Sequence, residues 1–230
     1  MFDYVVVGGG SAGCVLAARL SEDPAVQVAL LEAGGTDASV LIHCPAGLAL
    51  MAKSKGLNWA FQTVPQAGLG GRRGYQPRGK VLGGSSSINA MIYLRGQQAD
   101  YDAWAAEGNP GWSFNEVLPY FKRAEHNSRG ADVWHGSGGP LQVQDLLQPN
   151  RCSALFVDAA QQAGHVLNPD FNGATQEGVG PYQVTHRNGE RCSAAKAYLT
   201  PVLGRSNLTV ITGAQATRIL FEGRRAVGVE

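Results

Sequence analysis

The hydrophobic pattern at the start of the chain predicts a strand, a helix and a second strand in quick succession. Residues 4–7 (YVVV) are aromatic or β-branched and are bounded by glycine. Residues 12–20 follow as a predicted helix, and Pro24 marks its exit. Residues 26–31 form the next apolar run of strand length. This βαβ pattern is typical of a parallel sheet with a crossover helix, and it predicts an α/β fold.

The middle of the chain predicts further short elements. We expect a strand over residues 59–64, a helix over 86–91, and two more helices over 100–106 and 116–124. In the last of these helices apolar residues recur at helical spacing, and Pro119 falls in the first turn, where proline is tolerated.

The last part of the chain changes in composition before it returns to regular strands. Glycine, proline and asparagine become more frequent over residues 131–188, and the short apolar runs there predict the strands and loops of a second unit. A helix is expected over residues 191–199 and a strand over 208–211. Residues 216–221 and 226–229 are predicted to pair as a hairpin.

Composition is that of a globular protein and excludes some partners. The 230 residues are 44% apolar and 16% charged, and the 31 glycines indicate tight turns and close backbone approaches. A net charge of +1 supplies no sustained field, so neither nucleic acid nor anionic lipid is expected as a main partner. The four cysteines contain no C-x-x-C pair, so we expect no metal site, no disulfide framework and a reducing compartment.

Targeting and membrane-spanning patterns are not found in the sequence. Asp3 interrupts the start at once, so no secretory signal is expected and the protein is expected to begin at its true start. The longest apolar stretch, residues 40–52, is interrupted by His43, Pro45 and Gly47 and is shorter than the roughly 20 residues that span a bilayer. A cytoplasmic location is therefore expected, with peripheral attachment at the inner membrane as the alternative.

A glycine motif directly follows the first predicted strand and opens the first predicted helix. Residues 8–13 (GGGSAG) match G-x-G-x-x-G: Gly8 permits the sharp turn, Gly10 leaves room for a pyrophosphate, and Gly13 lets helix and strand pack closely. The helix amino terminus favours phosphates. Glu32, at the end of the second strand, is placed to accept hydrogen bonds from an adenosine ribose, and its carboxylate would repel the 2′-phosphate of NADP. The pattern does not separate FAD from NAD.

A second glycine turn lies in residues 78–89 (RGKVLGGSSSIN). It leads into a predicted helix amino terminus, and Ser85, Ser86 and Asn89 are able to donate or accept hydrogen bonds along an anionic or heterocyclic ligand. With its continuation through residues 90–96 (AMIYLRG), this segment resembles the signature of the glucose-methanol-choline (GMC) oxidoreductases.

The likeness covers essentially the whole chain. Within the family, the chain is most similar to bacterial choline dehydrogenase-like and aliphatic alcohol dehydrogenases. The further segments that resemble family blocks are residues 31–35, 57–59, 100–104, 108–112, 118–121, 135–141, 171–173, 177–180, 191 and 193–199.

The resemblance implies an FAD-dependent enzyme that oxidises a primary alcohol (choline, or an aliphatic or aromatic alcohol) to an aldehyde by hydride transfer to flavin N5. Electrons would pass on to oxygen, a quinone or another carrier. Carried over by residue, it places Gly8, Gly10, Gly13 and Glu32 on the ADP half of FAD, and Val81, Gly84, Ser86, Asn89, Ala90 and Met91 near the diphosphate and flavin. The expected cofactor-binding set also includes Ser11, Ala12, Ala33, Trp59, Arg78, Gly83, Ser85 and Ala216, the last standing where the family often has valine beside the adenine.

The implied fold is a Rossmann-like FAD-binding domain with part of an inserted α+β substrate domain. We expect residues 1–150 to form the first segment of the FAD-binding domain, 151–204 a partial substrate domain, and 205–230 an incomplete return to the FAD-binding domain. In the family a histidine near the carboxy terminus, paired with a second histidine or an asparagine, takes the alcohol proton. We therefore expect the catalytic histidine beyond Glu230, and a truncated chain that is inactive by itself.

Other residues with possible chemistry are assigned to structural roles. We expect the histidines to be loop or surface residues, Cys14 to be a buried inert thiol, and three tryptophans to be packing residues. These histidines are His43, His126, His135, His165 and His186, and these tryptophans are Trp104, Trp112 and Trp134.

Two other enzyme classes are disfavoured by the residues. Residues 74–80 satisfy G-x-x-x-x-G-K, but Val81 follows where a P-loop needs Ser or Thr, and Pro77 stiffens the loop. No segment supplies the G-x-S-x-G of a serine hydrolase. The remaining alternative is a nucleotide-binding module without catalysis, and bound FAD, which makes a protein yellow, separates the two.

Overall fold

The computed structural model describes residues 1–51 and 54–230, which divide into two compact units. The first comprises residues 1–90 and 189–230, and the second residues 91–188. The predicted limits of the FAD-binding and substrate domains stay a prediction, because compactness alone does not show which unit holds which ligand. Across the described residues, no helix is both long and apolar enough to traverse a bilayer; Ala52, which ends the apolar stretch considered above, lies outside them.

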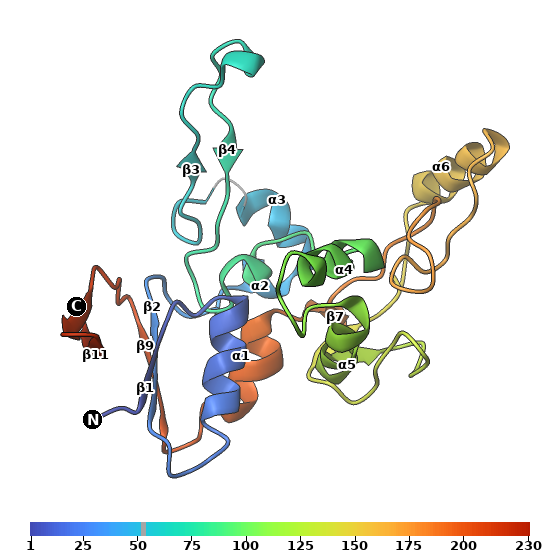
Figure 1. The fold of residues 1–230 in the computed structure, drawn as a ribbon. Coiled ribbons are helices and arrows are strands. Elements are labelled where there is room, and N and C mark those ends of the chain that lie inside the picture. The colour runs from blue at the N-terminus through green and yellow to red at the C-terminus, as the bar shows by residue number, and fades with distance from the viewer. Residues whose placement is uncertain (52–53) are drawn as a thin grey trace. The chain divides into compact units, whose positions relative to one another are not determined.

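The first unit contains most of the strands (Figure 1). Its elements are β1 (Tyr4–Val7), α1 (Ser11–Leu20), β2 (Val28–Glu32), α2 (Val40–His43), η1 (Pro45–Gly47), α3 (Leu48–Met51), β3 (Phe61–Gln62), η2 (Ala67–Leu69), β4 (Tyr75–Gln76), η3 (Gly84–Ser87), β8 (Glu190–Arg191), η4 (Ala195–Leu199), η5 (Thr200–Val202), β9 (Leu208–Thr212), β10 (Ile219–Glu222) and β11 (Arg225–Val229).

A three-stranded parallel sheet in the order β1-β2-β9 forms the centre of this unit. Helix α1 lies along the sheet, as Figure 1 shows, and packs against the π-helical turn η4. Small residues, Ala17 on α1 and Ala195 on η4, are almost fully buried in the core with Val28 and Leu30 of β2. Each fully buried valine or leucine contributes about 1.5–3 kcal/mol. Hydrophobic burial therefore holds α1 and η4 on the sheet.

The strand predictions for this unit are largely confirmed. The predicted first strand is β1, the helix is α1 with Ser11 added, and the second strand is β2, which begins two residues later than expected. The strand expected over residues 208–211 is β9, which pairs with β2 from Val28↔Leu208 to Glu32↔Thr212. The final hairpin is confirmed as β10 and β11.

Three local predictions for the first unit are wrong in type or extent. The strand expected over residues 59–64 is reduced to β3, because Ala60 has a positive φ of 53° that interrupts the extended backbone. Of residues 191–199, Arg191 belongs to strand β8, and the helical part is η4, which is π-helical, with Ala194 before it.

The helix expected over residues 86–91 is absent, and the chain makes the single turn η3 instead. The hydroxyls of Ser86 and Ser87 donate to the backbone oxygens of Gly83 and Leu82, at 2.5 and 2.7 Å. Serine side chains that bond the backbone in this way compete with a helix. Met91, with φ of 62°, is also incompatible with helix continuation.

The regular structure of the second unit is mostly helix, and irregular segments connect its elements. Its elements are α4 (Gln98–Ala106), α5 (Phe114–Ala124), β5 (Glu125–Asn127), β6 (Leu141–Val143), α6 (Arg151–Gln162) and β7 (His186–Arg187). Helix α6 corrects the prediction that residues 131–188 form only strands and loops. Asn150 caps it by accepting a hydrogen bond from Cys152 N at 2.8 Å, and none of its side chains is buried.

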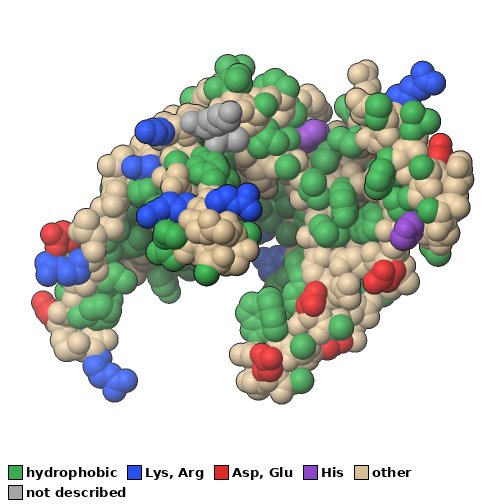
Figure 2. Space-filling view, turned by 90° about the horizontal axis from the view of Figure 1, so that it is seen from above, with side chains coloured by type: hydrophobic (Ala, Val, Ile, Leu, Met, Phe, Trp, Pro, Cys, Tyr) green, Lys and Arg blue, Asp and Glu red, His purple; other side chains and the backbone are tan. Residues whose placement is uncertain are grey.

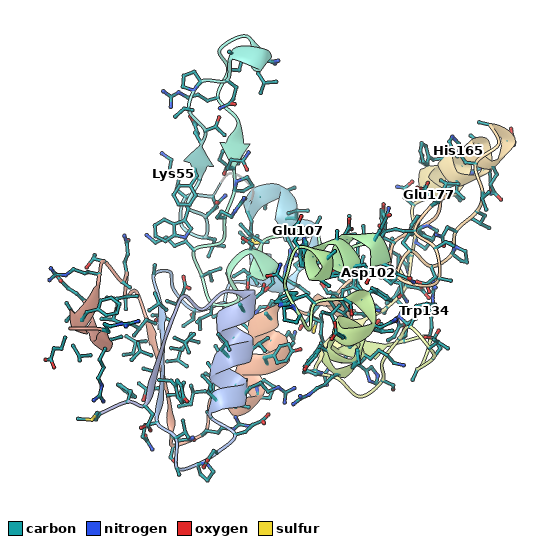
Figure 3. All side chains as sticks on the ribbon, viewed as in Figure 1. Lys55, Asp102, Glu107, Trp134, His165 and Glu177 are labelled. Atoms are coloured by element: carbon teal, nitrogen blue, oxygen red, sulfur yellow. The ribbon has the colours of Figure 1, made fainter. Side chains whose placement is uncertain are left out.

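Helix α5 begins earlier than predicted. Ser113 and Glu116 form a capping box, which places the helix start at Phe114. Pro119 consequently lies inside the helix and not in its first turn, so the expectation for this residue is wrong. Asp102 of α4, labelled in Figure 3, accepts a hydrogen bond from Phe114 N at 2.9 Å and joins the two helices.

A buried network of charged side chains organises the second unit. Glu125 accepts hydrogen bonds from Arg95 Nη2 at 2.5 Å and Asn127 Nδ2 at 2.7 Å, and its Oε1 lies 3.1 Å from His135 Nδ1. The other ring nitrogen of His135 lies 2.9 Å from Asp170 Oδ2. The network ties α5 and β5 to loops far away in the sequence.

The remaining histidines and tryptophans fit their predicted roles unevenly. His135 lies in an irregular segment, as expected of a loop residue, but it is only 3% exposed, so it is not a surface residue; His165 after α6 is exposed (Figure 3). Trp134 packs against Phe114, with ring centroids 6.1 Å apart. Trp104 and Trp112 contact each other edge-on at 5.7 Å but stay about half exposed.

On the face in Figure 2, charged side chains stand singly or in small groups among hydrophobic and uncharged ones.

The network shifts two pKa values in opposite directions. Burial raises the pKa of Glu125, but hydrogen bonds from His135 and Asn127 and the charge of Arg95 outweigh it and hold that pKa below its ordinary value of 4.5. The hydrogen bond to Glu125 raises the pKa of His135 above its ordinary value of 6.5; burial opposes this, and Asp170 adds to it.

These shifts predict a maximum in stability at mildly acidic pH. Because the pKa of His135 is raised in the folded protein, this histidine stabilises the fold fully below pH 6.5. The stabilisation is lost as the pH rises through the pKa that His135 has in the folded protein. Because the pKa of Glu125 is lowered in the folded protein, this carboxylate stabilises the fold fully above pH 4.5. The stabilisation is lost as the pH falls through the pKa that Glu125 has in the folded protein. Urea unfolding between pH 3 and about 9 should show the maximum between these limits. The variant H135Q should not lose stability as the pH rises above 6.5. If H135Q and the wild type lost the same stability in this range, the assignment of the loss to His135 would be contradicted.

Candidate functional site

The first glycine turn connects β1 to α1. Gly8 has φ of 94°, which favours glycine, and a Cβ on Gly13 would lie 1.9 Å from Gly8 O. The predicted tasks of both residues, a sharp turn and close packing of helix on strand, are therefore confirmed. Gly10 is the N-cap of α1, and a Cβ added there would meet no atom within 4 Å. No contact inside the chain requires glycine at this position, as expected where space is kept for a ligand.

The second glycine turn lies directly against the first. Gly83 N donates to Gly9 O at 2.7 Å, and Leu82 N donates to Gly35 O at 3.0 Å. Gly84 has φ of 54°, and a Cβ on it would lie 2.7 Å from Gly10 Cα. The two motifs, far apart in the sequence, therefore form one continuous backbone surface in the first unit.

Glu32 closes the other side of this surface. Its carboxylate is buried and accepts hydrogen bonds from Gly9 N at 2.8 Å and Gly34 N at 2.7 Å. A carboxylate has about four lone-pair sites, so both oxygens keep further acceptor capacity. Glu32 O also accepts from Ala214 N at 2.9 Å, which brings the segment before Ala216 to the end of β2.

The polar side chains of the second turn organise the turn itself. Ser85 Oγ accepts from Gly79 N at 3.1 Å, and Ser86 Oγ accepts from Ala194 N at 2.9 Å. Asn89 is exposed, and its Oδ1 accepts from Arg191 at 2.8 Å. The side chain of Val81 is fully buried in a small core cluster, so only its backbone is available to a ligand.

Other predicted residues lie around this surface or apart from it. Ser11 and Ala12 are exposed in the first turn of α1, and Ala33, Trp59 and Ala216 are partly buried. Trp59 N donates to Arg78 O at 2.8 Å, and Lys80 Nζ lies 4.4 Å from the Trp59 ring centroid, so this tryptophan packs on the segment that enters the second turn. Ala90 is exposed. Met91 belongs to the second unit, where its oxygen accepts from Thr185 N at 2.8 Å.

Some residues of this surface had no assigned role in the sequence prediction. Gly9 contributes both its N–H and its oxygen to the junction of the turns, and a Cβ on Gly34 would lie 1.9 Å from Lys80 O. Arg191 is buried and donates hydrogen bonds to the backbone oxygens of Ser86 and Asn89 in the second turn. Gly34 and Arg191 lie in segments that resemble the family, and this resemblance was the signal in the sequence that could have identified them.

Cys14 lies beneath the first turn and fits its predicted role. It is fully buried, and its Sγ donates to Gly9 O at 3.2 Å. Burial raises its pKa to about 11. The thiol therefore stays protonated and inert at neutral pH.

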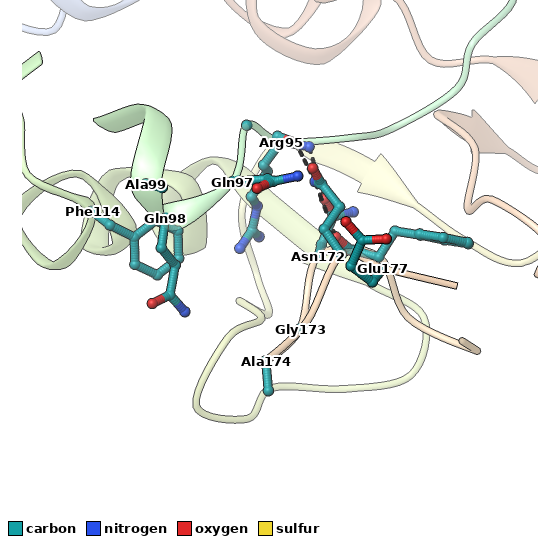
Figure 4. Close-up of a pocket in the computed structure, with 12 residues that line it drawn as sticks. Arg95, Gln97, Gln98, Ala99, Phe114, Asn172, Gly173, Ala174 and Glu177 are labelled. Atoms are coloured by element: carbon teal, nitrogen blue, oxygen red, sulfur yellow. Dashed lines mark hydrogen bonds between the residues drawn. The ribbon is translucent and has the colours of Figure 1, made fainter. Parts of the chain in front are cut away.

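The second unit contains a pocket with different chemistry (Figure 4). It has a volume of about 270 Å³, and four amide side chains are among the residues that line it, together with Phe114 and Glu177. Asn172 Oδ1 accepts from Arg95 N at 2.8 Å, and Gln176 Nε2 donates to Arg95 O at 2.8 Å. These amides hold the loop around Arg95 and supply no general base.

A parallel βαβ unit with a glycine turn at the helix start and a carboxylate at the end of the second strand defines the dinucleotide-binding class of α/β proteins. The chain belongs to the GMC oxidoreductase family, whose model matches residues 2–230. This family and the related solved structures are FAD-dependent flavoproteins. The sequence-based prediction of family, fold class and cofactor is confirmed.

Two curated relatives show the degree of similarity. The chain is 54% identical over 230 residues to the alcohol dehydrogenase (acceptor) of Pseudomonas putida, and it covers 42% of that protein. It is 48% identical over 231 residues to the oxygen-dependent choline dehydrogenase of Vibrio vulnificus, of which it covers 41%. All of this chain is matched in both cases, so it spans less than half the length of these relatives.

Solved structures show the same relation. Pyridoxine 4-oxidase from Mesorbium loti matches all of this chain with a TM-score of 0.95 and 38% identity, over 45% of its own chain. An FAD-dependent oxidoreductase from Chaetomium thermophilum matches with a TM-score of 0.90 and 32% identity, over 41% of its chain.

Proposed function

We propose that the first unit holds FAD in an enzyme that oxidises a primary alcohol to an aldehyde. The observation that carries this proposal is the direct contact of the two glycine turns, with Gly83 N 2.7 Å from Gly9 O. Because the two turns are in contact, a dinucleotide that binds to the first turn can also contact the second, so one FAD molecule can bind to both. When bound, FAD supplies the acceptor for the two electrons and the hydrogen removed from the alcohol carbon.

The diphosphate is assigned to the start of α1. Gly10 offers open space, no side chain caps the helix, and no acidic residue lies in its first turn. The N–H groups of the first turn are therefore available to an anion, and the helix dipole favours it. The residues that hold this part are Gly8, Gly10, Ser11, Ala12 and Gly13.

The adenosine is assigned to the end of β2. Glu32 has acceptor capacity for ribose hydroxyls, and Ala33 and Ala216 lie on the two segments that meet there through Ala214 N and Glu32 O. The flavin is assigned to the second turn and the segments that enter and leave it. Its residues in the first unit are Trp59, Arg78, Val81, Gly83, Gly84, Ser85, Ser86, Asn89 and Ala90, and Met91, the next residue along the chain, is retained from the family resemblance.

No described histidine is assigned as the base that takes the alcohol proton. His135 is buried, and each of its ring nitrogens faces a carboxylate, Glu125 or Asp170, so it is a member of a structural network. The proposed base is a histidine outside these 230 residues. On this proposal, residues 1–230 bind and orient the cofactor, and they do not complete an active site alone.

The names of the relatives, an alcohol dehydrogenase (acceptor) and an oxygen-dependent choline dehydrogenase, support an alcohol as substrate. The proposed electron acceptor is oxygen, a quinone or another carrier. A cytoplasmic location, with peripheral attachment at the inner membrane as the alternative, is part of the same proposal. It is supported by the four cysteines, all of which are free thiols.

Bound cofactor is the first test of this function. The native polypeptide that contains residues 1–230 should purify yellow with one FAD per chain, and anaerobic addition of a primary alcohol should bleach the flavin absorption. Absorption spectra and extraction of the cofactor measure both. A folded, colourless protein that takes up no added FAD would contradict the proposal and favour the nucleotide-binding module without catalysis.

A further inference from the structure

Arg191 is the most deeply buried cation of the first unit. The residue is 1% exposed and makes a fan of hydrogen bonds to backbone oxygens. Its Nε donates to Ile42 O at 2.9 Å, and its Nη1 donates to Asn89 O at 2.8 Å and to Ser86 O at 3.2 Å. The same Nη1 lies 2.8 Å from Asn89 Oδ1. One guanidinium thus joins α2 to the carboxy-terminal part of the second glycine turn.

This buried charge has no acidic partner among the described residues. No carboxylate lies within salt-bridge distance of Arg191, whereas Arg95, the other deeply buried arginine, is paired with Glu125 at 2.5 Å. Burial lowers the pKa of Arg191 to about 10, so the guanidinium keeps its charge at neutral pH. A buried cation without a counter-ion is unfavourable by itself, which points to a compensating negative charge that the protein does not provide.

One donor of the guanidinium is also unused. Arg191 Nη2 is buried and has no hydrogen-bond partner among the described residues. Buried donors in native structures are nearly always paired, and an orphan indicates a missing ligand, water or functional role. Nη1 of the same guanidinium bonds Ser86 and Asn89, which belong to the part of the turn assigned above to the flavin.

We propose that Arg191 is a positioning residue of the cofactor site, which fixes Asn89 and supplies a buried positive charge that favours the reduced form of bound FAD. The inference rests on the proposed function. Reduction adds negative charge to the flavin ring, so a fixed cation nearby binds the reduced form more tightly than the oxidised form. Because Arg191 acts from beneath the turn, its influence is on affinity and redox potential and not on proton transfer.

The midpoint potential of bound FAD tests this role. It is measured by anaerobic reductive titration of the native polypeptide that contains residues 1–230, in the wild type and in R191M, R191K, N89D and R224M. R191M removes the charge at similar volume. N89D keeps Arg191 but places a carboxylate against it. R224M removes an exposed charge from the β10–β11 turn and serves as the matched control.

R191M and N89D should each weaken the preference for reduced FAD about tenfold, which for a two-electron couple lowers the potential by about 30 mV. R191K should keep the wild-type potential but bind FAD several-fold more weakly, because one ammonium cannot span the carbonyls that the guanidinium joins. R224M should match the wild type in both measurements.

The outcomes separate this inference from the function on which it rests. If the wild type binds FAD but R191M and N89D keep its potential, the inference is overturned and the proposed function stands. If R191M does not fold, R191K decides the question, because FAD affinity equal to that of the wild type in R191K would overturn the inference. A wild type that binds no FAD overturns both.

Discussion

Replacing Gly13 with alanine is expected to destabilise the first unit and to abolish FAD binding. The added Cβ would lie 1.9 Å from Gly8 O and 3.0 Å from Gly8 C, and these are backbone atoms that cannot rotate away. Helix α1 would have to move off β1, which disturbs the turn between them. Overpacking of this kind costs about 1–3 kcal/mol and occasionally more, and a backbone clash belongs at the upper end. Urea unfolding followed by circular dichroism and FAD titration measure the two effects.

Gly10→Ala is the matched variant that separates binding from folding. Its Cβ would enter open space, so stability should stay within about 1 kcal/mol of the wild type, the usual cost of alanine at an N-cap. FAD affinity should nevertheless fall more than tenfold, because the methyl group occupies the space assigned to the diphosphate. Gly204→Ala, also in open space but outside the motif, should change neither. Unchanged FAD affinity in G10A would contradict the placement of the diphosphate.

Glu125→Leu is expected to destabilise the second unit by about 3–5 kcal/mol, because it leaves the buried guanidinium of Arg95 without its carboxylate. The substitution also removes the acceptor for Asn127 and for Gly136 N, and one carboxylate partner of His135. Unfolding of the native polypeptide in urea, followed by hydrogen exchange of amides in residues 91–188, localises the loss to this unit.

Asp145→Asn provides the control for that prediction. Asp145 pairs with Arg129 at 2.6 Å, but the two side chains are 53% and 35% exposed. Exposed pairs contribute about 0–1 kcal/mol, so D145N should have a small effect. Equal losses in E125L and D145N would show that burial does not decide the strength of these pairs, and the role given to the Glu125 network would be wrong.

The features predicted correctly from sequence are those encoded by neighbouring residues. A β-branched run bounded by glycine produced β1, and G-x-G-x-x-G between a strand and a helix identified the tasks of Gly8 and Gly13. The family signature in residues 78–96 led to the GMC oxidoreductases and to FAD. Each of these signals is local, so the order of residues is sufficient to read it.

The errors arose where distant contacts override local preference. Ser86 and Ser87 use their hydroxyls in a tight turn, so the expected helix over residues 86–91 does not form. His135 lies in a glycine-rich segment that looks exposed, but Glu125 and Asp170 enclose it. Helix α6 has apolar residues at helical spacing, Cys152, Leu155, Phe156 and Ala159, but it lies in a stretch rich in glycine, proline and asparagine, and that composition led to the prediction of strands and loops.

The sequence by itself determined the chemistry of this protein: a βαβ start, two glycine turns, an acidic residue after the second strand, and membership of an FAD-dependent family. Only the tertiary structure decided that Gly83 contacts Gly9, that β9 joins β2, and that Arg191 lies buried under the second turn without a carboxylate. Residue type and spacing record interactions between neighbours along the chain. Contacts between distant segments depend on how the core packs, and that appears only once the chain is folded.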